Sequence, residues 1–438
     1  MKSIGDVFVS NYIEELYNAN QIAEVDVLVC GAGPAGVGAA IRAARNGAKV
    51  MIVESLGCLG GIATAGMMSN WGGTSSSKIL LEIYERSYEI DKGFTWNTDY
   101  EYDRTQIPHD LLMIILEQMM QEAKVEILYY TLVCDAVVED GSIKGVIVQN
   151  KDGRGYIKAK YVIDSTGDGD VAAAAGVPFV KGRETDGSMQ PATLMFKIGG
   201  VDYERAVFPH SFETEVETEK GELQALGKQI LPFPAGHVLL YEQPEPGTVC
   251  CNMTNCIKVD GTKVEDLTKA TLTCRSQILP IIKFLREYAP GYEKCWLQSS
   301  ASLIGVRETR HFKGLKSLTV EDILEANTYN DWVVRDAHFD LDVHNMTGPS
   351  LDKTGMQKEF KQQGNYTIPY GCLVPVNVEG LLLSGRNISG AHLAHASYRI
   401  MSVCIATGEA AGAAAVLALK QNKPLKDIDT KDIQELIL

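Results

Sequence analysis

Three glycines near the N-terminus have the spacing that a dinucleotide site requires. Gly31, Gly33 and Gly36 form a Gly-x-Gly-x-x-Gly pattern directly after the apolar run 27–30. In such a pattern the first glycine permits a tight turn, the second lets the backbone approach a pyrophosphate, and the third lets a helix pack closely on the strand. The chemistry that these residues predict is the binding of a dinucleotide.

The elements around these glycines support the same interpretation. Residues 27–30 suit a buried strand, and the alanine-rich segment 35–46 suits a helix with Gly47 as its left-handed C-terminal cap. The N-terminus of that helix would present free N–H groups to phosphates. A second strand over 49–53 ends at Glu54, where a carboxylate can bind a ribose diol.

The composition is that of an ordinary globular protein with two or three domains' worth of core. The chain has 438 residues, of which 45% are hydrophobic and 22% charged, and its formal net charge is −15. The acidic balance argues against a nucleic-acid partner. The N-terminus lacks the pattern of a secretory signal, so we expect a cytoplasmic protein. The apolar stretch 400–419 carries Glu409 at its centre, which favours a buried helix over a membrane span.

The ten cysteines include no Cys-x-x-Cys pair. This excludes a cysteine-ligated zinc or iron–sulfur centre of recognisable spacing, and the sequence predicts no metal site. We interpret the cysteines as reduced, half-buried thiols.

Strand and turn patterns continue after the first unit. Runs at 125–130, 132–138, 143–149 and 155–158 are separated by turn residues and predict a meander of hairpins, followed by a buried strand over 161–164. Helical patterns cover 111–123 and 262–288. The expected organisation is a nucleotide-binding domain over 22–190 with its meander at 125–160, an inserted domain over 191–364, a return over 365–420 and a tail over 421–438.

Five segments together resemble flavoproteins of the glutathione-reductase and fumarate-reductase type, and most closely the FAD-dependent oxidoreductases. They are the glycine pattern with Glu54, and the segments 58–64, 163–170, 305–310 and 383–412. The resemblance implies an α/β fold in which an FAD-binding Rossmann-like domain of the glutathione-reductase type carries an inserted α+β substrate domain. Cys58 lacks the second cysteine of the disulfide reductases, so a dithiol relay is not expected. No histidine-rich motif for covalent flavin is present, so the expected FAD is non-covalent.

The resemblance also implies which residues bind FAD. Glu54 would meet the adenosine ribose, Val133 the adenine, and the N-terminus of the last long helix the flavin. The complete set is Gly31, Ala32, Gly33, Pro34, Ala35, Glu54, Ser55, Gly60, Gly61, Ile62, Val133, Thr166, Gly167, Asp170, Gly385, Arg386, Met401 and Ser402.

Candidate catalytic residues follow the glycine-rich loop 385–390. His392, His395 and Arg399 have the spacing i, i+3, i+7, which would put them on one face of a helix. His392 could act as acid or base, and Arg399 could clamp a carboxylate. Arg307 is a second candidate. The alternative for each group is a structural role, in which His395 and Arg399 bond buried loop carbonyls and Arg307 belongs to an ion-pair network.

The predicted function is an FAD-dependent oxidoreductase that transfers hydride between FAD and a small metabolite. If Arg399 acts as a clamp for a carboxylate, this metabolite is an anion. The sequence specifies neither the electron acceptor or donor nor the oligomeric state. One alternative is a flavoprotein subunit of a larger electron-transfer complex. Less favoured are a tRNA-modifying flavoprotein and a flavin-free NAD(P) dehydrogenase. The aromatic residues Trp96, Tyr100 and Tyr102 are candidates for covering the site.

Overall fold

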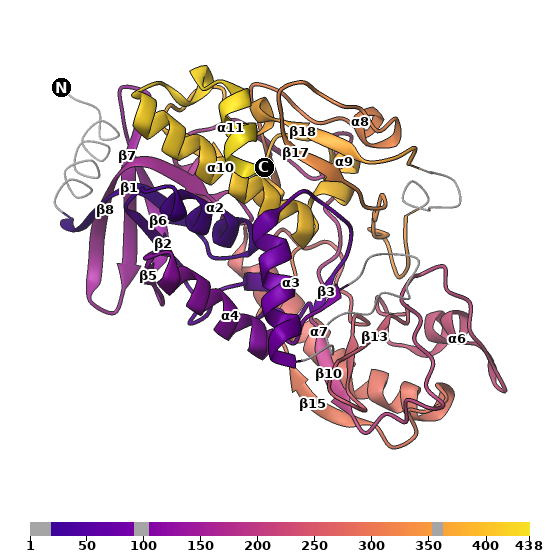
Figure 1. Cartoon of the computed structure of the whole chain (residues 1–438). Helices are drawn as coiled ribbons and strands as arrows, with labels where there is room; N and C mark the ends of the chain where they lie inside the picture. The colour runs from indigo at the N-terminus through magenta and orange to yellow at the C-terminus, as the bar shows by residue number, and fades with distance from the viewer. Residues whose placement is uncertain (1–18, 92–104, 353–361) are drawn as a thin grey trace, which may run out of the picture.

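The computed structural model describes residues 19–91, 105–352 and 362–438, so the aromatic residues at 96, 100 and 102 lie outside the described part. At its centre is a seven-stranded sheet with the strand order β5-β2-β1-β8-β7-β6, in which β19 also pairs with β8 (Figure 1). The bounds are β1 Asn20–Cys30, β2 Val50–Val53, β5 Glu126–Leu128, β6 Leu132–Glu139, β7 Ser142–Asn150, β8 Gly153–Asp164 and β19 Leu381–Leu383.

One half of this sheet is parallel and the other is antiparallel. β5, β2, β1, β8 and β19 run parallel, whereas β6, β7 and β8 form antiparallel hairpins. The side chains of residues 27–30 are fully buried, as expected for a parallel strand covered on both faces. The fold is therefore mixed α/β with a parallel sheet.

The structure corrects two details of the predicted meander. The runs 155–158 and 161–164 are one continuous strand, β8, because its first half pairs with β7 while its last residues pair with β19. The run at 125–130 becomes β5, which pairs with β2 rather than with β6. The meander thus consists of β6, β7 and β8 only.

Two helices, α2 (Pro34–Arg45) and α10 (Met401–Gln421), pack side by side against the sheet (Figure 1). Gly47, after the end of α2, has the predicted left-handed conformation, with φ of 95°. α10 is long and apolar enough to cross a membrane, but 89% of its apolar window is buried inside the structure. Its Glu409 forms an ion pair of 2.6 Å with Arg42 of α2, so α10 is a core helix.

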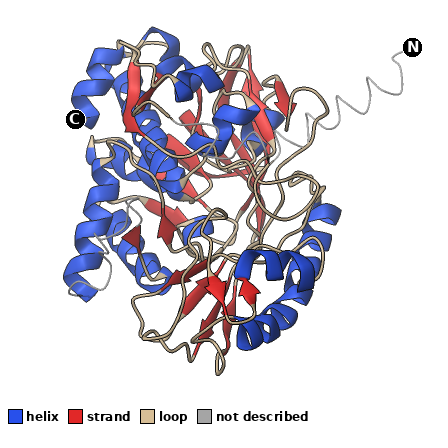
Figure 2. Ribbon diagram, turned by 90° about the vertical axis from the view of Figure 1, so that its right-hand side faces the viewer, coloured by secondary structure: helices blue, strands red, loops and turns tan. Residues whose placement is uncertain are grey.

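A second sheet lies at one end of the molecule, with a long helix beside it (bottom of Figures 1 and 2). Its strand order is β13-β14-β10-β15, with bounds β13 Leu240–Glu242, β14 Val249–Cys251, β10 Phe196–Gly199 and β15 Trp296–Ser300. The helix is α7 (Val264–Tyr288). Apart from Met67, the buried apolar side chains of this part come from residues 192–304 and form their own cluster.

The first apolar cluster includes residues that the sequence suggested for the inserted domain. Phe312, Leu318 and Leu341 pack with the central sheet and not with the second cluster. The structure therefore differs from the expected boundary at residue 364, because the chain returns to the first core soon after residue 304. The expected tail also contains a helix, whose Ile433 and Ile437 are buried.

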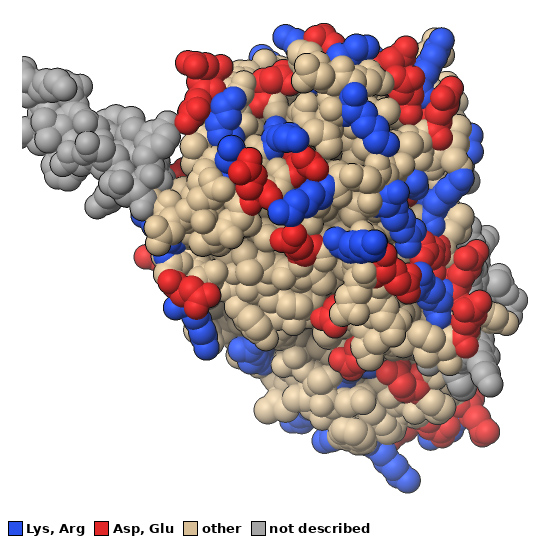
Figure 3. Space-filling model, turned by 60° about the vertical axis from the view of Figure 1, so that its left-hand side comes forward, with Lys and Arg blue, Asp and Glu red and all other residues tan. Residues whose placement is uncertain are grey.

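The remaining helices and strands lie around these two sheets or in the segments between them. They include α3 Lys78–Asp91, α4 His109–Glu122, α5 Asp170–Ala174, α6 Leu223–Ile230, α8 Val320–Leu324, α9 His392–Tyr398, α11 Thr430–Ile437, β3 Asn70–Trp71, β4 Thr105–Gln106, β9 Phe179–Lys181, β11 Glu217–Thr218, β12 Gly221–Glu222, β16 Arg310–Phe312, β17 Trp332–Ala337 and β18 Tyr366–Pro369. On the face drawn in Figure 3, acidic and basic side chains are interspersed.

Candidate active site

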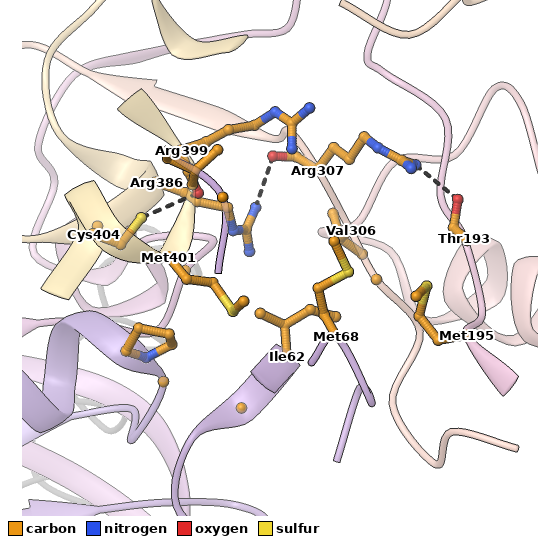
Figure 4. Close-up of a pocket in the computed structure, with 18 of the residues that line it drawn as sticks. Ile62, Met68, Thr193, Met195, Val306, Arg307, Arg386, Arg399, Met401 and Cys404 are labelled. Atoms are coloured by element: carbon orange, nitrogen blue, oxygen red, sulfur yellow. Dashed lines mark hydrogen bonds between the residues drawn. The ribbon is translucent and has the colours of Figure 1, made fainter. Parts of the chain in front are cut away.

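A cavity of about 450 Å³ lies where the two apolar clusters meet. Its wall combines the N-terminal ends of α2 and α10 with loops of the central sheet and side chains of the second cluster. Figure 4 shows Met68, Met195 and Val306 on one side of this space and three arginines on another. The cavity therefore has apolar side chains on one side and arginines on another.

The glycines of the Gly-x-Gly-x-x-Gly pattern lie at one end of the cavity, at positions where a side chain would clash or would enter open space. Gly31 has φ of 90°, and a Cβ on Gly36 would lie 1.9 Å from the carbonyl oxygen of Gly31. A Cβ on Gly33 would meet no atom within 4 Å, so open space lies directly beside the N-terminus of α2. This cradle of free backbone fits a dinucleotide phosphate.

Glu54 lines the cavity close to these glycines and is 8% exposed. Its Oε2 accepts a hydrogen bond of 2.8 Å from the N–H of Ala32, and its Oε1 accepts from the Ser55 hydroxyl and the Leu56 N–H. These bonds hold the carboxylate in place, and Oε2, which accepts only one of them, retains a further lone pair for a ribose hydroxyl.

The loop at 60–62 lies opposite the helix N-terminus. Gly60 has φ of 95°, and its N–H donates to the carbonyl of Ala32 at 2.7 Å. A Cβ on Gly61 would lie 3.1 Å from the Cα of Gly33, so the two glycine segments approach each other closely. Gly61 and Ile62 line the cavity, as the resemblance implies for residues beside a flavin.

Arg386 and the end of β8 close another side of the cavity. Arg386 pairs with Asp168 at 3.0 Å and donates to the carbonyl oxygen of Arg307, as Figure 4 shows for the second bond. Asp170, in contrast, pairs with Arg310, and its side chain is 55% exposed.

At the N-terminus of α10, Ile400, Met401 and Cys404 line the cavity, whereas Ser402 does not line it and donates to the carbonyl of Gly72. The partial positive charge of a helix N-terminus therefore faces this space.

Arg307, Arg399, Asp342 and His344 form a charged cluster in the cavity wall. Arg399 donates to Asp342 at 2.8 Å, and the Nε2 of His344 lies 3.4 Å from the same carboxylate oxygen. Arg307 donates to the carbonyl of Pro191 and to the hydroxyl of Thr193. It forms no ion pair with any carboxylate in the described part of the chain.

These groups influence each other's protonation. Burial and the nearby Arg399 lower the pKa of Arg307 to about 10. Burial opposes the charge of Asp342, but His344, Arg399 and Arg307 outweigh it and hold the pKa of this carboxyl well below its ordinary value. Burial, with Arg307 nearby, lowers the pKa of His344 to about 4. At neutral pH the cluster therefore contains two guanidinium cations, one carboxylate and a neutral imidazole.

The structure separates the candidate catalytic residues. His392 and His395 point from α9 into a buried cluster with Glu308 and His311 and do not line the cavity. Arg399 caps the C-terminus of α9 and does line it. One short helix thus directs its two histidines and its capping arginine to different places.

Most of the expected FAD residues lie in the wall. Those that line the cavity are Gly31, Gly33, Pro34, Ala35, Glu54, Ser55, Gly61, Ile62, Thr166, Gly167, Gly385, Arg386 and Met401. Those that do not are Ala32, Gly60, Val133, Asp170 and Ser402. Val133 belongs to β6, where its backbone pairs with Val148.

The sequence patterns did not identify two residues of the charged cluster, Asp342 and His344, as candidate site residues. They belong to the segment 340–344, in which Leu341 and Val343 are buried while the polar residues between and beside them line the cavity. This alternation of polar and apolar residues is the signal of an extended segment with one polar face. The wall also contains the acidic residues Asp168, Glu213 and Asp340.

The sequence profile of the family described as FAD dependent oxidoreductase matches residues 26–437. Among curated proteins, thiamine thiazole synthase of Aeropyrum pernix is 34% identical over 155 residues, which are 32% of this chain and 54% of that protein. The corresponding protein of Pyrococcus furiosus is 32% identical over 38% of this chain and 65% of its own length. The chain thus spans less than two thirds of these relatives.

Solved structures share the fold at low sequence identity. A geranylgeranyl bacteriochlorophyll reductase-like protein of Thermoplasma acidophilum is 14% identical, with a TM-score of 0.50 over 94% of this chain and 82% of its own. A triple mutant of the flavin-dependent brominase Bmp2 is 13% identical, with a TM-score of 0.51 over 94% of this chain and 83% of its own.

Proposed function

Because this chain belongs to the FAD dependent oxidoreductase family, and is therefore an FAD-dependent enzyme, we propose that it exchanges a hydride between non-covalently bound FAD and a small anionic metabolite. Family membership argues against a flavin-free dehydrogenase. We further propose that the central domain is of the glutathione-reductase type. In this proposal the residues of the second apolar cluster form its substrate domain.

The residues of the cavity suggest where FAD would lie. The open backbone at Gly33 would hold the pyrophosphate, Glu54 the ribose, and the segment 60–62 with the N-terminus of α10 the flavin. When bound, FAD supplies the acceptor or donor of the hydride. The side chains of the protein would bind and orient the substrate and transfer its proton.

The proposal that the substrate is an anion rests on the guanidinium of Arg307. It lines the cavity beside the Arg399–Asp342 ion pair and has no carboxylate partner of its own among the described residues. A cation removed from water is costly unless an anion or several hydrogen bonds compensate it. A substrate carboxylate between Arg307 and Arg399 would supply that anion and would be oriented by two planar donors.

His344 is our candidate for the group that accepts the proton released when the substrate gives up a hydride. Its imidazole lines the cavity and is neutral at pH 7, because burial and Arg307 lower its pKa to about 4, and a substrate carboxylate bound between the arginines would make it more basic. Asp342, whose oxygen lies 3.4 Å from its Nε2, would stabilise the imidazolium that forms.

The test uses carboxylates and their matched neutral amides as probes. Hydroxy acids, dicarboxylates and unsaturated acids are added to the FAD-loaded protein without oxygen, and the flavin spectrum reports both binding and bleaching. We expect carboxylates to bind and amides not to bind. Removing one charge-assisted contact by Arg307→Met should weaken binding by about 10- to 100-fold.

Two further variants complete this test. Arg307→Lys keeps the charge and should lose less affinity than Arg307→Met. Arg335→Met is the control, since Arg335 is exposed and pairs with Asp336 outside the cavity wall. Equal binding of amides and carboxylates would contradict the proposal. A partner protein that co-purifies and is needed for turnover would favour the alternative of an electron-transfer subunit.

A further inference from the structure

A second cluster of polar side chains lies behind the charged wall of the cavity. It consists of Glu308, His311 of β16, and His392 and His395 of α9. These side chains are from 0% to 4% exposed. The proposed reaction uses none of them, although the sequence suggests His392 and His395 for catalysis.

The cluster is built around one carboxylate. The Oε1 of Glu308 lies 2.8 Å from the Nε2 of His311 and 2.6 Å from the Nδ1 of His392. The rings of His311 and His395 are 4.7 Å apart and nearly perpendicular. One ligand atom from each of Glu308, His311 and His395 can be chosen so that all lie within 4.8 Å of one another.

Three ring nitrogens in this cluster are buried without a hydrogen-bond partner. They are the Nδ1 of His311, the Nε2 of His392 and the Nδ1 of His395. Hydrogen bonds to Glu308 account for the other nitrogen of His311 and of His392 only. Buried polar atoms in folded proteins almost always have a partner, so unpartnered atoms at one place indicate a missing water or ion.

We propose that Glu308, His311 and His395 bind a divalent transition-metal ion, with Zn²⁺ as the expected occupant. Imidazole nitrogens and a carboxylate oxygen are ligands that Zn²⁺ prefers. With bonds of about 2.1 Å and tetrahedral angles, ligand atoms of one zinc ion are about 3.4 Å apart. The three ligand atoms of the cluster lie within 4.8 Å of one another, which is near this spacing.

His392 would be a positioning residue rather than a ligand. It lies 2.6 Å from the carboxylate of Glu308, the arrangement by which outer residues orient metal ligands. The backbone N–H of His392 in turn donates to Glu184 at 2.9 Å.

The site would fix the geometry of the substrate cavity without touching it. Glu308 follows Arg307 directly, and His395 belongs to the helix whose C-terminus is capped by Arg399. One ion bound to both segments would therefore set the distance between the two arginines. This inference does not depend on the proposed substrate, because it concerns the residues behind the wall.

The competing explanation is a cluster without metal, in which protons shared between imidazoles and Glu308 balance the charge. The two explanations differ in metal content. The full-length, FAD-loaded protein is dialysed against EDTA, separated by gel filtration and analysed for metals, and Zn²⁺ is then titrated into any metal-free protein. We expect one ion per chain. Protein that holds no metal and binds no added Zn²⁺ would overturn the proposal.

Zinc could also be bound by some of the ten cysteines, and X-ray absorption distinguishes this from binding at the proposed site. Zinc in the proposed site has nitrogen and oxygen neighbours only, whereas a sulfur neighbour would assign the metal to cysteines and refute the site. This measurement needs only the wild-type protein. It therefore decides the question even if variants fold poorly.

Substitutions locate the ion. Glu308→Gln and His395→Gln should each remove the stoichiometric metal, and His392→Gln should weaken Zn²⁺ binding by about 10- to 100-fold. His338→Gln is the matched control, because this histidine bonds the carbonyl of Gly364 outside the cluster. Another divalent ion that is removed by the same substitutions would equally support the site. Full metal content in Glu308→Gln and His395→Gln would contradict it.

Discussion

At the scale of single residues, each fingerprint glycine has a separate physical role. Gly31 and Gly36 are required by the protein itself, because a side chain at either position would collide with neighbouring backbone. Gly33 is different, since a Cβ there would meet no protein atom within 4 Å. Its lack of a side chain serves a ligand and not the fold.

Gly33→Asp should therefore leave the protein folded and abolish FAD retention. The new carboxylate would occupy the open space at the N-terminus of α2 and repel the pyrophosphate. The measurement is the ratio of flavin to protein absorbance after gel filtration, together with the melting temperature. Gly364→Asp is the control, because its Cβ would also lack close contacts and it lies outside the cavity wall. A folded Gly33→Asp variant that retains FAD would refute this placement.

Asp342 links the charged cluster to the pH dependence of stability. Burial opposes its ionisation, but His344 and the two arginines lower its pKa below that of the unfolded chain, so the folded state binds fewer protons. The resulting stabilisation is complete above the unfolded pKa of about 4 and is lost as the pH falls through the folded value.

Asp342→Asn should thus lower the free energy of unfolding at pH 7 by about 1–3 kcal/mol, because charge-assisted bonds to Arg399 are lost. The difference from the wild type should shrink as the pH falls from about 5 to 3. Urea unfolding at several pH values measures it. Asp336→Asn, at an exposed position, should change stability by less than about 0.5 kcal/mol. A difference that stays constant with pH would contradict the assignment.

At the scale of elements, the contact between α2 and α10 positions the dinucleotide end of the cavity. A Cβ on Gly408 would lie 1.9 Å from the carbonyl oxygen of Ala35, and one on Gly412 would lie 2.3 Å from that of Ala39. The two helices can approach so closely only because these positions have no side chain. Ala35 lines the cavity, so this contact also fixes the N-terminus of α2.

Gly408→Ala should push the helices apart and destabilise the protein by about 1–3 kcal/mol. It should also weaken FAD binding, because Ala35 would move. Thermal unfolding and the dissociation constant of FAD measure the two effects. Gly364→Ala, where the nearest atom would be 3.7 Å from the Cβ, is the control. Unchanged stability of Gly408→Ala would show that the helices are not held at this distance.

At the scale of the whole molecule, the cavity forms between two apolar clusters. Gly33 and Glu54 follow strands β1 and β2 of the central sheet, whereas Met195 and Tyr241 belong to the second cluster. The glycine cradle and part of the apolar wall are therefore supplied by different parts of the chain. This division explains how a common nucleotide-binding core can serve different chemistries.

Purified protein should show the two visible bands of flavin, and acid or heat should release FAD into the supernatant. We expect this because the chain has no histidine-rich motif for covalent attachment and its cavity offers backbone and charge for non-covalent binding. Chromatography of the released chromophore identifies it. A chromophore that stays with the precipitated protein would show covalent attachment instead.

The sequence by itself determined the nucleotide-binding unit, the long helices and most strands of the central sheet. Gly31, Gly33, Gly36 and Glu54 could be interpreted because a strand, a glycine turn and a helix follow one another within one short segment, and their roles depend on local backbone geometry. The helices α4 and α7 follow from local apolar periodicity in the same way, α2 from its alanine-rich sequence, and α10 from a long apolar run with Glu409 at its centre.

Only the tertiary structure decided which polar residues share the cavity. The spacing of His392, His395 and Arg399 suggests one face, yet α9 ends at Tyr398, and Arg399, as its cap, turns to Asp342 instead. Asp342 and His344 reach Arg307 and Arg399 because residues far apart in the chain pack together. Such contacts depend on how whole elements are arranged in space, and no local pattern of residues encodes that arrangement.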